Sequence, residues 1–144
     1  MSDSLRHVRL TRVGAGGFQI TNDAGGTIDV GLADSDFTPV ELLLAALAGC
    51  AAINVEEITG RRATPDRFEV TASGDKVRDE SGGRMENLQL LFDVVFPEGE
   101  GGDAARAILP RVVQQTHDRI CTVSRTVASG SEVDYVLTDP DDRA

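Results

Sequence analysis

The stretch TPVELLLAALAGCAAINVEEITG, residues 38–60, decides the fold of this chain. It begins with the pattern of a capping box, in which Thr38 caps the first turn of a helix and Glu41, three residues later, bonds back to the cap. Pro39 suits the first helical position, and Gly60 is typical of the residue at which a helix ends. The stretch therefore predicts one long helix between Thr38 and Gly60.

The middle of this helix is apolar throughout. No side chain from Leu42 to Ile53 is polar, so we expect a central, buried helix that is covered on every side. The apolar run is too short to cross a bilayer, which needs about 20 apolar residues. Its leucines favour an aliphatic pocket formed around Leu43, Leu47 and a partner chain. Cys50 stands in the middle of the run.

The length of 144 residues predicts a single domain, which we place at residues 1–138, with a disordered acidic tail at 139–144. Aromatic residues are few and tryptophan is absent, whereas alanine and glycine are abundant. Such a lean core indicates that a second copy of the chain supplies part of the burial. We therefore expect a homodimer.

The formal net charge is -10 and the sequence pI is about 4.5. A nucleic acid or an anionic membrane surface would need a basic patch, so we expect neither as a partner. The first ten residues, MSDSLRHVRL, lack the pattern of a secretion signal. These features predict a cytoplasmic protein, a compartment in which a structural disulfide is unusual.

Three short strands are expected before the helix, over residues 7–13, 18–21 and 27–30, joined by glycine-rich turns. After the helix, strict alternation over residues 67–73 and again over 88–96 predicts a long hairpin with one buried face. The first three strands therefore form a meander, and the last two form a separate pair.

A second helix is expected to be capped by Asp103 and to be kinked or split by Pro110. Cys121 heads a short helical turn that ends at Ser129-Gly130, and residues 131–137 read as a last strand. The order is three strands, a helix, two strands, two helices and a strand, which is an α+β fold. The apolar face of the second helix is assigned to Ala104, Ala107, Ile108, Val112 and Val113.

The two cysteines, Cys50 and Cys121, leave two interpretations open. A cysteine among alanine and leucine in a buried helix is more often an inert small residue than a nucleophile, and Cys50 lies too far along its helix for the dipole to lower its pKa. Cys121 sits at a helix start, where free N–H groups favour a thiolate, with Arg119 and Arg125 nearby. Redox chemistry and simple packing both fit the pair.

Two further residues are auxiliary candidates. Glu41 is explained by the capping box, and a helical rise of about 13.5 Å keeps it from Cys50 of the same chain, so it could act only from a partner chain. Arg12 lies with Arg6 and Arg9 on or near the first strand, where one of them could point into a dimer cleft.

No metal or other cofactor is predicted. The two histidines, His7 and His117, are far apart and lack the ligand spacing of a zinc site. The sequence also contains no phosphate-binding loop, no nucleophile elbow and no dinucleotide fingerprint. Nothing in it favours a nucleotide-binding protein or a serine hydrolase.

Together, two segments resemble the OsmC/Ohr family of osmotically inducible and organic-hydroperoxide-resistance proteins. They are FTPVELLLAALAGCAAINVEEI and, after the hairpin, THDRICTVSRTVASGSEVDYVL, and the similarity covers nearly the whole chain. The resemblance implies an intertwined α+β homodimer with a buried helix from each chain at its centre. The sequence of the first segment is more similar to a less characterised branch of the family than to OsmC or Ohr proper.

The resemblance also implies a chemistry. In the peroxidase branches, the first cysteine attacks an organic hydroperoxide as a thiolate and becomes a sulfenic acid, and the second condenses with it to a disulfide that external thiols reduce. By position, Cys50 matches the peroxidatic residue and Cys121 the resolving one. The chain is then expected to act as a thiol-dependent peroxidase in oxidative-stress defence.

Two departures from the peroxidase pattern support an alternative. Val40 stands where those branches carry a glutamate, and Gly16-Gly17-Phe18 stands where they carry an arginine. The alternative is a non-enzymatic member of the family that binds a small apolar ligand or senses redox state through its thiols. Inert, purely structural thiols are a third possibility.

Overall fold

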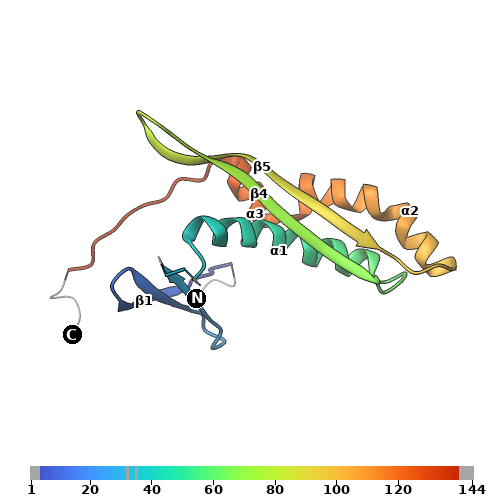
Figure 1. The fold of residues 1–144 in the computed structure, drawn as a ribbon, viewed down its shortest axis with the longest axis horizontal. Helices are drawn as coiled ribbons and strands as arrows, with labels where there is room; N and C mark the ends of the chain where they lie inside the picture. The colour runs from blue at the N-terminus through green and yellow to red at the C-terminus, as the bar shows by residue number, and fades with distance from the viewer. Residues whose placement is uncertain (1–3, 32, 35, 140–144) are drawn as a thin grey trace. The chain divides into compact units, whose positions relative to one another are not determined.

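The computed structural model describes residues 4–31, 33–34 and 36–139 (Figure 1). Contacts group the chain into two units, residues 1–49 with 69–92 and residues 50–68 with 93–144. The boundaries between the units pass through single helices and strands, so each element is described by itself. The domain predicted at residues 1–138 stays a prediction.

The first three strands form the predicted meander. β1 (Arg9–Gly14), β2 (Gly17–Thr21) and β3 (Thr27–Gly31) pair in that order, and both pairings are antiparallel. The β1–β2 turn contains Gly16 at φ 70°, a left-handed conformation that glycine adopts without strain. The prediction is confirmed, with strand ends displaced by one or two residues.

The predicted capping box is confirmed in atomic detail. α1 (Pro39–Thr59) begins where the backbone N–H of Thr38 donates to Oε1 of Glu41 at 2.9 Å. In return, the N–H of Glu41 donates to Oγ1 of Thr38 at 3.3 Å. Two of the N–H groups that a helix start leaves unpaired are thereby satisfied.

The burial of α1 differs from the expectation. Within the single chain, the buried residues of α1 form one stripe at four-residue spacing, whereas Ile53 is 68% exposed. The stripe is one face of the helix, so the expectation of burial on every side is not met within the single chain. The stripe consists of Leu47, Ala51, Val55 and Thr59.

The expectation that this helix is too short for a bilayer is also corrected. α1 has 21 residues, and by length and composition alone it could cross a membrane. The apolar core helix of a soluble protein meets the same criterion, so the helix by itself does not distinguish the two.

The predicted hairpin is present and is longer than the alternation indicates. β4 (Arg67–Asp79) and β5 (Gly82–Val95) form a two-stranded sheet (Figure 1). Arg67 and Asp93 form a bidentate ion pair across the hairpin, with both N–O distances 3.0 Å.

α2 (Glu100–Gln115) corrects the predicted cap. Its cap is Gly99, at φ 116°, while Asp103 lies inside the first turn and pairs with Arg106 at 2.6 Å. Pro110 lies within the helix and does not split it.

The buried face of α2 is also rotated from the predicted one. Gly102 has no room for a Cβ because the Pro97 carbonyl lies against it. Ala104 and Ala107 of the predicted face are exposed, whereas Val112 of that face is buried as predicted. The buried residues are Gly102, Ala105 and Val112.

The end of the chain contains a π-helical turn, η1 (Thr116–Ile120), and α3 (Thr122–Ser129). Gly130 ends α3 at φ 63°, as predicted. The strand predicted at residues 131–137 is wrong for the single chain, because no described segment pairs with these residues. Tyr135 is 95% exposed and Leu137 is 99% exposed. The α+β class is confirmed without the final strand.

Candidate functional site

The structure brings the two cysteines together. Cys50, on α1, and Cys121, before α3, belong to the same unit, and the Cys50 side chain is one of the groups that lower the pKa of the Cys121 thiol. Both are free thiols. Two segments that are far apart in the sequence thus bring their cysteines close together.

Cys121 is the N-cap of α3, and its sulfur accepts the backbone N–H of Ser124 at 3.4 Å. The residue is fully buried. Burial, the largest single influence, raises the pKa of the Cys121 thiol. The hydrogen bonds from the side chain and backbone of Ser124, from Cys50 and from the N–H of Val123 together outweigh burial and lower this pKa below its ordinary value.

Cys50 has different surroundings. It lies in the middle of α1 and is half-buried. The Nδ2 of Asn54, one turn further along, donates to the Cys50 carbonyl at 2.8 Å and lies 3.7 Å from the Cys50 sulfur. The sequence reasoning missed Asn54, although its four-residue spacing from Cys50 places the two on one helix face.

The turn before Cys121 is unusual. The N–H of Cys121 donates to the carbonyl of Thr116 at 2.9 Å, which closes a π-helical turn. Such turns are rare and are frequent at functional sites. Thr116 is buried, and its hydroxyl has no hydrogen-bond partner among the residues that the structure describes. A buried polar group usually has a hydrogen-bond partner. The π-helical turn and the Thr116 hydroxyl are therefore two unusual features next to Cys121.

The two auxiliary candidates lie in the other unit. Glu41 is engaged in the capping box, and its pKa is lowered by the hydrogen bonds from the Thr38 backbone and then from the Thr38 side chain. Arg12 is exposed on β1, opposite Phe18 of β2. Their action on the cysteines stays a prediction.

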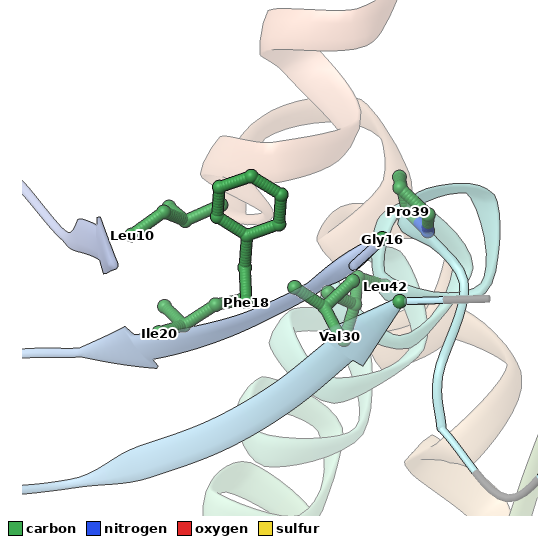
Figure 2. Close-up of a pocket in the computed structure, with 8 residues that line it drawn as sticks. Leu10, Gly16, Phe18, Ile20, Val30, Pro39 and Leu42 are labelled. Atoms are coloured by element: carbon green, nitrogen blue, oxygen red, sulfur yellow. The ribbon is translucent and has the colours of Figure 1, made fainter. Parts of the chain in front are cut away.

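An apolar cavity of about 410 Å³ lies between the meander and the start of α1 (Figure 2). Arg12 shares a sheet face with Phe18, because directly opposed residues of an antiparallel pair point to the same side. The pocket predicted around Leu43 and Leu47 is a different one and stays a prediction. The observed cavity is lined by Leu10, Gly16, Phe18, Ile20, Val30, Gly31, Pro39 and Leu42.

Within the described ranges, no three histidine, cysteine or carboxylate side chains come together as metal ligands would. The arrangement of residues 50 and 121 is instead that of a dithiol. One of the two sulfurs, that of Cys121, is held in surroundings that favour the thiolate.

The family model for OsmC-like proteins matches residues 32–136. The chain therefore belongs to the OsmC-like family. No protein with a curated functional description matches the chain significantly.

Solved structures share the fold at low sequence identity. An OsmC-like protein of unknown function from Vibrio cholerae has a TM-score of 0.71 at 16% identity, covering 85% of this chain and 93% of its own. An OsmC-like protein from Mycoplasma pneumoniae has a TM-score of 0.69 at 14% identity, with coverages of 88% and 89%. The organic hydroperoxide resistance protein OhrB of Bacillus subtilis has a TM-score of 0.51 at 18% identity, with coverages of 83% and 90%.

The position of Cys121 predicts a pH dependence. In a Cys50→Ser protein, where the serine hydroxyl replaces the neighbouring thiol, the thiolate absorbance of Cys121 is expected at lower pH in the folded chain than in the same chain unfolded in urea. Because the folded pKa is lowered, the thiolate stabilises the fold above the unfolded pKa, and this contribution is lost as the pH falls through the folded pKa. Ultraviolet titration of both states checks this, and a higher folded transition would contradict it.

Proposed function

We propose that this protein is a thiol-dependent peroxidase that reduces organic hydroperoxides in oxidative-stress defence, with Cys50 as the nucleophile and Cys121 as the resolving thiol. The observation that carries the proposal is that Cys50 and Cys121 lie in one unit, with Cys121 at the start of α3 and Cys50 near enough to influence its pKa. A sulfenic acid must be captured before more peroxide oxidises it further, and a thiol nearby can capture it quickly.

The reaction has two chemical steps before reduction. The Cys50 thiolate attacks the distal oxygen of the hydroperoxide, the O–O bond breaks, and the alkoxide leaves and takes a proton to become an alcohol. Cys50 is now a sulfenic acid. The Cys121 thiolate attacks its sulfur, releasing hydroxide, which is protonated to water, and forming the disulfide. External thiols return both sulfurs to the reduced state, so the cycle needs no metal or other cofactor.

The activation of Cys50 has two sources in this proposal. Asn54 donates toward the Cys50 sulfur from the same helix. Arg12, and Glu41 through a partner chain, are the auxiliary candidates for activating Cys50. We expect the aliphatic pocket predicted around Leu43, Leu47 and the partner chain to favour alkyl hydroperoxides over hydrogen peroxide.

Mass spectrometry under non-reducing conditions, after one equivalent of cumene hydroperoxide, tests the proposal. We expect a Cys50–Cys121 disulfide in the wild type and, in a Cys121→Ser protein, a sulfenic acid trapped at Cys50. A Cys50→Ser protein is the matched control and should show no rapid oxidation of Cys121. Unmodified thiols in all three proteins would overturn the proposal.

The second candidate is a non-enzymatic protein that binds a small apolar ligand or senses redox state. The apolar cavity between the meander and α1 favours it, as do Val40 and Gly17 at positions where peroxidases of the family carry a glutamate and an arginine. Thiols that stay unmodified by hydroperoxide would favour ligand binding. A disulfide that forms once and is not turned over by thiols would favour a sensor.

A homodimer in the cytoplasm is part of the same proposal. The OsmC-like fold, the exposed faces of α1 and the exposed C-terminal segment support the dimer. No nucleic-acid or membrane partner is proposed, in keeping with the acidic composition.

A further inference from the structure

The two sulfur atoms of the pair differ in what surrounds them. Cys121 is fully buried at the start of α3, and its sulfur accepts the backbone N–H of Ser124 at 3.4 Å. Cys50 is half-buried within the single chain, in the middle of α1 and away from either helix end. The helix-start donor therefore belongs to Cys121, and the greater exposure belongs to Cys50.

This asymmetry matters for the reduction of a disulfide between them. In thiol–disulfide exchange, a thiolate attacks one sulfur, and the other departs as a thiolate. The attacked sulfur has to be reachable, and the better leaving group is the sulfur whose thiolate is better stabilised. In this pair, accessibility selects Cys50 for attack, and the hydrogen bonds at the start of α3 select Cys121 as the leaving group.

We propose that the reduction of this protein has a fixed direction: an external thiol attacks the sulfur of Cys50, and Cys121 leaves into the hydrogen bonds at the start of α3. The inference rests on the proposed function for the origin of the disulfide during turnover. The partner that it names is a small thiol whose sulfur reaches the Cys50 side of the pair.

The step balances in two exchanges. A first thiolate forms a mixed disulfide with Cys50, and the electron pair of the broken S–S bond goes to Cys121. A second thiolate attacks the sulfur of the bound thiol, giving the disulfide of the reductant and the Cys50 thiolate. Cys50 then takes a proton, which restores its thiol.

The test begins with a disulfide made by diamide, so that no peroxide chemistry is needed. The oxidised protein is treated with limiting 2-mercaptoethanol, quenched rapidly with acid, alkylated and mapped by peptide mass spectrometry. We expect the mercaptoethanol adduct on Cys50 and the alkyl label on Cys121. An adduct on Cys121, or equal amounts on both, would overturn the inference, and so would failure of diamide to form the disulfide.

A pair of variants tests the leaving group. Ser124→Ala removes the side-chain donor to Cys121, and the disulfide is expected to be reduced about threefold more slowly. Ser129→Ala, on the same helix, removes a hydroxyl that bonds to the Thr126 carbonyl and should leave the rate unchanged. Equal rates for the two variants would contradict the role of the α3 start.

The outcomes separate this inference from the proposed function. If the thiols do not react with cumene hydroperoxide, but the disulfide formed by diamide gives the Cys50 adduct, the peroxidase proposal is contradicted and the direction of reduction is supported. If hydroperoxide forms the disulfide, but reduction gives the Cys121 adduct, the peroxidase proposal is supported and the direction is contradicted.

Discussion

Replacing Cys50 by serine is expected to lower the steady-state consumption of cumene hydroperoxide, with excess dithiothreitol as reductant, by a factor on the order of 10³ or more. The hydroxyl of serine is not ionised near neutral pH and is a poor nucleophile toward a peroxide oxygen, so the first chemical step is lost. The rate of dithiothreitol oxidation under saturating hydroperoxide measures this effect.

The control for this variant is Ala45→Ser, which places a serine on the exposed part of the same helix and should keep the wild-type rate. A Cys121→Ser protein should instead complete one rapid turnover and then slow, because its sulfenic acid has no neighbouring thiol to capture it. If the Cys50→Ser protein kept the wild-type rate, Cys50 would not be the nucleophile.

The parts of the fold that the sequence predicted well are those with local causes. The capping box joins Thr38 and Glu41, which are only three residues apart, and both of its hydrogen bonds are present. The meander and the hairpin follow from alternation and glycine turns, which also act over a few residues. Their existence was predictable, and only their ends shifted.

The sequence predictions fail where the structure depends on groups that are distant in the sequence or outside the chain. Gly99 replaces Asp103 as the cap of α2 because a left-handed glycine starts the helix earlier. Gly102 lies too close to the Pro97 carbonyl for a Cβ, a close approach that no periodicity reveals. Residues 131–137 carry strand-forming side chains, but a strand forms only where a second strand offers backbone partners.

The candidate site was predictable in part. The two cysteines could be singled out from their segments, whereas their proximity depends on how α1 and α3 pack within one unit. The stabilisation of Cys121 by a helix start was anticipated from its position before Thr122, and the cap bond from Ser124 provides it. Asn54 was missed because an asparagine that follows an apolar run is usually a solvent-facing residue of the helix.

Replacing Ile53 by glutamate is expected to break the proposed homodimer. Ile53 is an isoleucine 68% exposed on α1 of a single chain, and burying such a side chain against a second copy contributes about 1.5–3 kcal/mol. A carboxylate there would add a desolvation penalty of several kcal/mol. Together these terms raise the dissociation constant by at least about 10³, since every 1.4 kcal/mol is about tenfold. Sedimentation equilibrium of the wild type and the variant measures the change.

The matched control for this variant is Glu57→Gln, which alters a side chain that is 66% exposed on the same helix. Surface changes of this kind shift stability by about 0.5 kcal/mol or less, so the control should stay dimeric. If the dimer covers α1, the thermal midpoint of the wild type also rises with protein concentration, because association stabilises only the folded chain. A wild-type chain that sediments as a monomer, with a midpoint independent of concentration, would show that the apolar helix stays uncovered and would sink the dimer.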